Sequence, residues 1–200
     1  MTARAPKPKK DVGLSPRVLA IVGACFLIAG IAMMFVLKPR PAGETLVGGP
    51  FQLVNAEGKA VTDADFRGHP FLVYFGYIHC PDICPTTLAQ LSEVLQRIPD
   101  KPIKVLFVTV DPERDTAKLM ADYVSSFDSR FIGLSGSVNQ IAAIEKAYRV
   151  FARKAPTKDG DYTMDHSSIV YLMDGRGAFV KVLNLDRSAD EEAKDLARYL

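Results

Sequence analysis

Continuous apolar runs alternate along the chain with segments in which apolar residues recur every three or four positions, as on one face of a helix. Continuous hydrophobic runs at 71–77 and 103–110 have the length of strands, and they predict central strands that are buried on both faces. Between them, residues 85–98 place leucine or isoleucine at spacings of three and four, which predicts an amphipathic helix. Pro85 suits the first turn of this helix, because its missing N–H needs no partner there. This order predicts a strand–helix–strand unit with parallel strands.

The remainder of the chain continues this alternation. Residues 115–127 predict a helix in which Leu119, Tyr123 and Phe127 face the core. The sequence Asp-Gly-Arg-Gly at 174–177 is a strong hairpin signal. The other expected elements are a hairpin within 51–61, a strand at 131–134, a helix at 138–148, strands at 168–173 and 178–183, and a helix at 189–200. The whole pattern predicts an α/β, thioredoxin-like fold with an N-terminal β-hairpin.

A membrane anchor is predicted before this domain. Residues 18–37 carry no charge, and a helix of this length spans about 30 Å, the thickness of the hydrocarbon core of a bilayer. The basic residues that precede it predict a cytoplasmic N-terminus by the positive-inside rule. We therefore expect a single-pass protein of the cell inner membrane, with a cytoplasmic tail at 1–17, the transmembrane helix, a linker at 38–48 and a periplasmic domain at 49–200. A cleavable signal peptide is the alternative, but its apolar region is usually shorter, about 7–15 residues.

Composition narrows the classes of function. The chain has 200 residues, of which 48% are hydrophobic and 24% charged, values typical of one globular domain with a short extension. The net charge of +2 is misleading, because the basic excess lies before residue 41 and the rest of the chain is mildly acidic. We therefore expect no nucleic-acid partner, since binding to phosphates requires a basic face.

Two cysteines lie where α/β folds commonly place their functional sites. Cys80 and Cys84 lie between the strand at 71–77 and the helix at 85–98, at the carboxyl end of the strand. We expect Cys84 to precede or cap the helix, where the positive end of the helix dipole lowers the pKa of a thiol. In an oxidising compartment, a CxxxC pair forms a structural disulfide, a redox centre or part of a metal site. The position at a strand–helix junction favours a functional role over a structural one.

The chain has three histidines, and one of them is expected to reach the cysteines. His69 lies in a Gly-His-Pro turn, and the side chain of His79 should point away from that of the adjacent Cys80. His166 stands just before the strand expected at 168–173, where a thioredoxin-like fold usually presents a proline to the substrate. Two thiolates and one imidazole form a soft ligand set that suits Cu(I), or zinc with a fourth ligand, whereas Cu(II) would need an added oxygen ligand.

Three stretches around these residues form a combination that is more specific than the CxxxC spacing alone. They are VYFGYIHCPDICP at 73–85, FVTVDPERDT at 107–116 and MDHSS at 164–168. This combination resembles the Sco/SenC family, the copper chaperones for cytochrome c oxidase assembly. The resemblance implies one copper ion, Cu(I) or Cu(II), bound by Cys80, Cys84 and His166. It also implies delivery of copper to, or thiol reduction at, the dinuclear copper A site of the oxidase's second subunit, with other copper chaperones and the membrane as further partners.

Three further features stay open on the sequence alone. Asp111 is either a carboxylate that supports the site or contacts a partner, or an ordinary turn residue before Pro112, which we favour slightly. Asp82 is interpreted as a turn residue or as a contact for a partner. Residues 153–160 are expected to form a polar surface loop, which is either static or mobile enough to move His166.

Three hypotheses of function compete for this sequence. In the first, the protein is a metallochaperone that holds copper and passes it to an enzyme in the same membrane. In the second, it is a thiol–disulfide oxidoreductase in which Cys80 and Cys84 cycle between the dithiol and the disulfide. In the third, it is a redox sensor that signals through a partner.

Overall fold

The computed structural model describes residues 47–200. The predicted cytoplasmic tail at 1–17, the transmembrane helix at 18–37 and nearly all of the linker at 38–48 lie outside the described residues. Within 47–200, no helix combines the length and the apolar character that crossing a bilayer requires.

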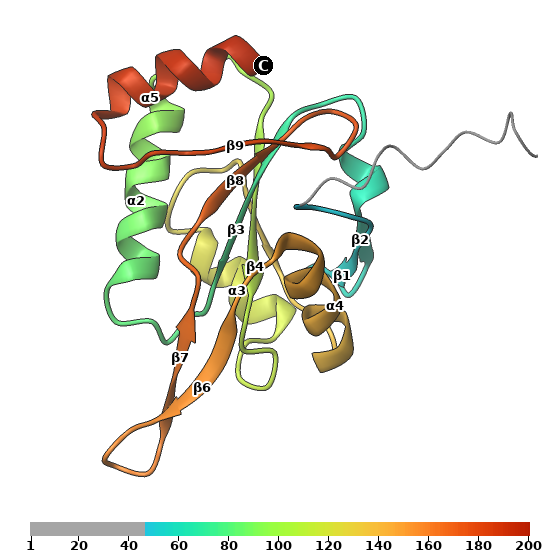
Figure 1. The fold of residues 1–200 in the computed structure, drawn as a ribbon, viewed down its shortest axis with the longest axis vertical. Helices are drawn as coiled ribbons and strands as arrows, with labels where there is room; N and C mark the ends of the chain where they lie inside the picture. Colours follow the sequence, from blue (N-terminus) through green and yellow to red (C-terminus); the bar gives the residue numbers. More distant parts are fainter. Residues whose placement is uncertain (1–46) are drawn as a thin grey trace, which may run out of the picture. The chain divides into compact units, whose positions relative to one another are not determined.

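Five strands form the central sheet of the domain (Figure 1). They are β3 (Phe71–Gly76), β4 (Lys104–Thr109), β5 (Phe131–Leu134), β8 (Val170–Met173) and β9 (Phe179–Val182). Their order across the sheet is β5-β4-β3-β8-β9, with β3, β4 and β5 parallel and β8 antiparallel to both of its neighbours. The α/β, thioredoxin-like fold predicted from the sequence is confirmed.

Helices connect and cover these strands. The described α-helices are α2 (Ile83–Gln96), α3 (Ala117–Val124), α4 (Val138–Tyr148) and α5 (Ala189–Leu196). α2 and α5 pack against each other, and α3 packs against β5. Every residue of β3 and nearly every residue of β4 is buried, as their continuous apolar sequences predict. Because these two strands are parallel, their carboxyl ends meet at one edge of the sheet, where the loop to α2 and the turn to α3 begin.

Helix α3 differs from the prediction in its length and in the face that it buries. It begins two residues later than the predicted 115–127, because the hydroxyl of Thr116 accepts a hydrogen bond from the amide of Leu119 and so caps the helix, and it ends three residues earlier, at Val124. Leu119 is 48% exposed, so the prediction that it faces the core is wrong. Met120 and Val124, one helical turn apart, are the buried residues of this helix.

A glycine allows α3 to lie close to the sheet. A Cβ atom at Gly133 of β5 would lie 2.4 Å from backbone atoms of Met120, so a larger residue there would push the helix away. Tyr123 and Phe127 pack at the margin of the core, as predicted.

A separate hairpin stands where the sequence predicted a polar loop. It consists of β6 (Ala152–Pro156) and β7 (Tyr162–His166), which pair antiparallel with each other as a two-stranded sheet (Figure 1). The prediction of a loop is wrong for 153–156, which belong to β6, because both strands are half-buried or exposed along their length and so lack the apolar alternation that marks a strand in a sequence. Residues 157–160 form the exposed turn of the hairpin, as a surface loop was predicted to do.

The predicted N-terminal hairpin is present. β1 (Gln52–Val54) and β2 (Ala60–Thr62) pair antiparallel, and Gly58 takes a φ of 71° in the turn between them, a value that favours glycine. A β-bridge between Val54 and Ser135 joins this hairpin to the end of β5. Two short 3₁₀ helices, Asp63–Phe66 and Ala197–Tyr199, complete the described elements.

Candidate metal centre

The two cysteines lie where β3 gives way to α2. Cys80 is half-buried in the loop, and Cys84 is the second residue of the helix and fully buried. The amide of Cys84 donates a hydrogen bond to the sulfur of Cys80 at 3.3 Å. We expected Cys84 to precede or cap the helix, but Asp82 holds the N-cap position. The side chain of Asp82 is exposed and accepts a hydrogen bond from the hydroxyl of Thr86 at 3.4 Å, which agrees with a turn residue.

His166 reaches this pair of sulfurs from the end of β7. Its Nε2 lies 3.6 Å from the Sγ of Cys84, and its Nδ1 lies 3.1 Å from the carbonyl oxygen of Ser167. Since a carbonyl only accepts, Nδ1 carries the proton and the lone pair of Nε2 faces the cysteines. The ring of Tyr77 meets the imidazole edge to face, with 5.7 Å between centroids. The two sulfurs and one imidazole nitrogen all lie within 4.8 Å of one another.

Burial controls the protonation of these groups. It raises the pKa of the Cys84 thiol to about 12, which outweighs the position of this residue in the first turn of α2. The position at the start of the helix therefore does not give this thiol a low pKa, contrary to the expectation from the sequence. Burial also lowers the pKa of His166, so its imidazole stays neutral and keeps a lone pair for a ligand.

A glycine that the sequence analysis overlooked gives the buried sulfur its space. A Cβ atom at Gly76, the last residue of β3, would lie 2.8 Å from the Sγ of Cys84 and 2.7 Å from the ring of Phe107. In the sequence, Gly76 lies inside the continuous apolar run at 71–77, where a glycine weakens the pairing and packing of a strand. An interior glycine just before a CxxxC pair was the available signal for this role.

The other two histidines lie outside this group. His69 is exposed at the amino end of β3. His79 is also largely exposed, and its Nδ1 lies 3.8 Å from a carboxylate oxygen of Asp115. The imidazole of His79 therefore turns toward the β4–α3 turn.

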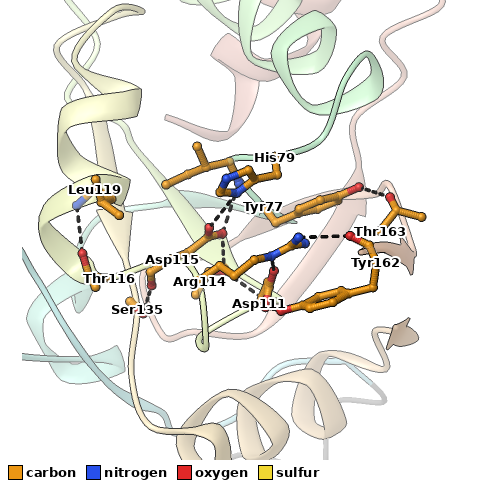
Figure 2. Close-up of polar contacts among 12 residues, drawn as sticks. Tyr77, His79, Asp111, Arg114, Asp115, Thr116, Leu119, Ser135, Tyr162 and Thr163 are labelled. Atoms are coloured by element: carbon orange, nitrogen blue, oxygen red, sulfur yellow. Dashed lines mark hydrogen bonds and ion pairs between the residues drawn. The ribbon is translucent and has the colours of Figure 1, made fainter. Parts of the chain in front are cut away.

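Asp111 and Asp115 anchor a polar network in the turn between β4 and α3 (Figure 2). The carboxylate of Asp111 is 1% exposed and accepts from the Nε of Arg114 at 2.5 Å and from the hydroxyl of Tyr162 at 3.0 Å. The turn therefore contacts β7, the strand that ends in His166. Asp111 is a turn residue, as we slightly favoured, because its carbonyl oxygen accepts from the amides of Arg114 and Asp115. Its side chain has the further role of joining two separate elements.

Asp115 connects the same turn to the cysteine loop. Its fully buried carboxylate accepts from the amide of Ile78 at 3.1 Å and from the hydroxyl of Thr109 at 2.8 Å. Burial raises the pKa of this carboxyl group. Sequence reasoning missed both Arg114 and Asp115, although they belong to the TVDPERDT stretch.

Comparison with known proteins identifies relatives along most of the chain. The model of the SCO1/SenC family matches residues 39–200. The protein SCO2 homolog, mitochondrial, of Bos taurus is 41% identical over 157 residues, 76% of this chain and 59% of the relative. The SCO2-like protein RP587 of Rickettsia prowazekii is 38% identical and covers 82% of this chain and 89% of its own length. The chain spans about half to three fifths of the first curated relatives, including the SCO1 homolog 1 of Arabidopsis thaliana at 49%.

Solved structures give the same result. The copper-bound structure of Bradyrhizobium japonicum ScoI is 54% identical, with a TM-score of 0.72, and covers 77% of this chain and 99% of its own. Yeast Sco1 with copper bound is 32% identical, with a TM-score of 0.71, and covers 76% of this chain and 87% of its own. The chain therefore belongs to the SCO1/SenC family.

Proposed function

We propose that this protein binds one copper ion, as Cu(I) or Cu(II), through Cys80, Cys84 and His166 and serves the assembly of cytochrome c oxidase. The observation that carries the proposal is the meeting of two sulfurs and one imidazole nitrogen within 4.8 Å, from segments far apart in the sequence. Such soft donors favour copper over hard cations. The proposal is supported by the copper-bound structure of the 54% identical ScoI of Bradyrhizobium japonicum.

The protonation states of the three groups describe what copper binding requires. The thiols of Cys80 and Cys84 release their protons as the metal binds, because thiolate is the form that coordinates. His166 needs no such change, since its Nε2 already carries a lone pair and its Nδ1 proton points to the carbonyl of Ser167. Cys80 is the more exposed sulfur, so we propose that an acceptor protein reaches the copper from the side of Cys80.

The proposed acceptor is the copper A site of the oxidase's second subunit, with other copper chaperones as donors. We further propose that residues 18–37 anchor the protein in the cell inner membrane, with the domain in the periplasm. A tether to the membrane of the acceptor raises the effective concentration of the donor without any new contact.

Copper loading of the full chain, purified in detergent and reduced, tests this proposal. We expect one copper ion per chain in the wild type and none retained after gel filtration in the Cys80→Ser/Cys84→Ser variant. Cys25→Ser is the matched control, because the third cysteine is not one of the proposed ligands and its loss should leave the stoichiometry unchanged. A double-serine variant that still holds one copper ion would refute the assignment.

A specific observation favours a second candidate function, thiol–disulfide exchange. The two sulfurs lie on one short bend, and the amide of Cys84 already contacts the sulfur of Cys80. In such a reaction, the two thiols become a disulfide and lose two protons and two electrons, while an acceptor disulfide becomes two thiols. His166→Ala distinguishes the two functions, because it should weaken copper binding and leave the rate of disulfide exchange with a model peptide largely intact.

A further inference from the structure

One residue of the histidine-bearing strand is held at three points. The Nη1 of Arg114 donates to the carbonyl oxygen of Tyr162 at 3.0 Å, and its guanidinium carbon lies 3.8 Å from the centre of the Tyr162 ring. The hydroxyl of the same tyrosine donates to Asp111 at 3.0 Å. Figure 2 shows the side chain of Arg114 reaching from the β4–α3 turn to this tyrosine. Main chain, ring and hydroxyl of Tyr162 are thus all fixed to one turn.

The hairpin depends on such contacts for its position. β6 and β7 pair only with each other, outside the five-stranded sheet, and none of their residues is fully buried. A further hydrogen bond joins the hydroxyls of Tyr77 and Thr163 at 2.5 Å. Where few apolar contacts are buried, local stability rests on such individual polar contacts.

The position of Tyr162 is passed on to His166 through the strand. Side chains two and four residues apart lie on the same face of a strand, so Tyr162 and His166 share a face of β7. They are separated by about 13 Å of extended backbone, at about 3.3 Å per residue. A shift of Tyr162 along or away from the β4–α3 turn would therefore move the imidazole relative to the two sulfurs.

We propose that Arg114 is a positioning residue for His166, which holds β7 so that Nε2 stays within reach of the metal bound by the cysteines. Asp111 acts with it by orienting the guanidinium through the hydrogen bond to Nε. The charge of the buried carboxylate is balanced by the guanidinium, so the pair can lie beneath the hairpin. This inference rests on the proposed copper site.

Competition with the chromophoric Cu(I) chelator bicinchoninate measures the effect in the full chain. Arg114→Ala should lower the affinity for Cu(I) about tenfold, the usual cost of removing a group that orients a metal-binding histidine. Arg114→Lys keeps the charge but cannot form the same fork and stacking contact, so it should restore only part of the affinity. Tyr162→Phe, which loses only the hydroxyl contact, should have a smaller effect than Arg114→Ala.

A matched control comes from a second arginine of similar environment. Arg130 is 15% exposed, compared with 19% for Arg114, and it also pairs with a nearby aspartate and donates to a distant backbone carbonyl, that of Ile98. Arg130 lies at the amino end of β5, whereas the cysteines follow the carboxyl end of β3. Because these strands run in the same direction, the two sites lie at opposite ends of the sheet. Arg130→Ala should therefore lower thermal stability by a similar amount and leave the affinity for Cu(I) unchanged.

A double-mutant cycle separates positioning from general destabilisation. In the His166→Ala background, Arg114→Ala should cause no further loss of Cu(I) affinity, because the imidazole through which it acts is gone. In the copper-free protein, hydrogen exchange at the amides of 162–166 should become about tenfold faster in Arg114→Ala, as expected when a charge-assisted hydrogen bond is lost.

The outcomes that overturn this inference differ from those that refute the proposed function. Wild-type affinity or wild-type exchange in Arg114→Ala, or an undiminished effect in the His166→Ala background, would show that Arg114 does not act through the histidine. A wild-type protein that takes up no copper at all would instead refute the proposed function.

Discussion

At the scale of single residues, space is as important to the candidate metal centre as donor chemistry. The side chain of Cys84 is fully buried, and its sulfur lies close to Gly76 at the end of β3, a position that the ring of Phe107 also approaches. The neutral imidazole of His166 lies beside this sulfur, on the side of β7, so neither donor depends on a charged partner in the metal-free protein. Small changes of volume beside the sulfur should therefore affect the site directly.

Gly76→Ala tests this requirement for space. The added methyl group would meet the Cys84 sulfur at 2.8 Å and Phe107 at 2.7 Å, so the sulfur or the ring must move. We expect a loss of about 1–3 kcal/mol in the free energy of unfolding, measured by urea denaturation, together with weaker copper binding. Gly49→Ala is the control, because its Cβ would make an ordinary contact of 3.4 Å, and it should change neither quantity. Unchanged copper binding in Gly76→Ala would show that the surroundings of the sulfur adapt.

At the scale of elements, burial decides what the sequence can predict. Strands β3 and β4 were predicted because both of their faces are buried and their sequences are continuously apolar. The meeting of Cys80, Cys84 and His166 followed from the topology, since the fold brings the carboxyl end of β3 to the segment before β8. The β6–β7 hairpin could not be predicted in this way, because its strands have no buried face.

Contacts between distant side chains are the second limit on sequence reasoning. Arg114 and Tyr162 are 48 residues apart, and no local pattern marks their stacking or their hydrogen bond. Leu119 was assigned to the core because it lies four residues before Tyr123, a spacing that fits one face of a helix. In the structure, the buried face of α3 is instead the one that carries Met120. Hydrophobic periodicity therefore predicted the elements, whereas the contacts that orient them required the structure.

Glu145, on the face of α4 near the hairpin, should make the stability of the fold depend on pH. Glu145 lines a cavity of about 210 Å³ together with residues of β6 and the β4–α3 turn. Burial raises its pKa to about 7, compared with about 4.3 for glutamate in an unfolded chain, so the folded state binds this proton more tightly. Its contribution to stability is therefore fully present below pH 4.3 and is lost as the pH rises through about 7.

Glu145→Gln should remove this dependence on pH, because the amide is neutral throughout. We expect the urea midpoint of the variant to exceed that of the wild type by much less at pH 5 than at pH 8, because most of the loss falls between these two values. Glu93→Gln is the control, since Glu93 is an exposed residue of α2 and its replacement should change stability little at either pH. An equal gain in stability at pH 5 and pH 8 would contradict the argument, because it would arise from packing and not from the proton.

At the scale of the whole molecule, the candidate site brings together parts of the fold that are far apart in the sequence. Cys80 and Cys84 belong to the β3–α2 junction, and His166 ends a hairpin that lies outside the central sheet. The β4–α3 turn contacts both regions, through Asp115 to the cysteine loop and through Arg114 to β7. A metal ion held by all three donors would therefore cross-link the cysteine loop to the β6–β7 hairpin, in addition to the polar contacts and the packing of Ala152 and Met164 against the core.

Copper should for this reason stabilise the folded protein as a whole. A ligand that binds only the native state at a free concentration one hundred times its Kd adds about 2.7 kcal/mol to the free energy of unfolding, and binding of copper by the cysteines of the unfolded chain would reduce this gain. Only the folded chain holds all three donors within 4.8 Å of one another. We expect Cu(I) to raise the Tm of the full chain, measured by thermal denaturation under reducing conditions, and a strong chelator to reverse the rise. The increase should be smaller in His166→Ala and absent in Cys80→Ser/Cys84→Ser. An equal increase in the double-serine variant would place the stabilising copper at another site.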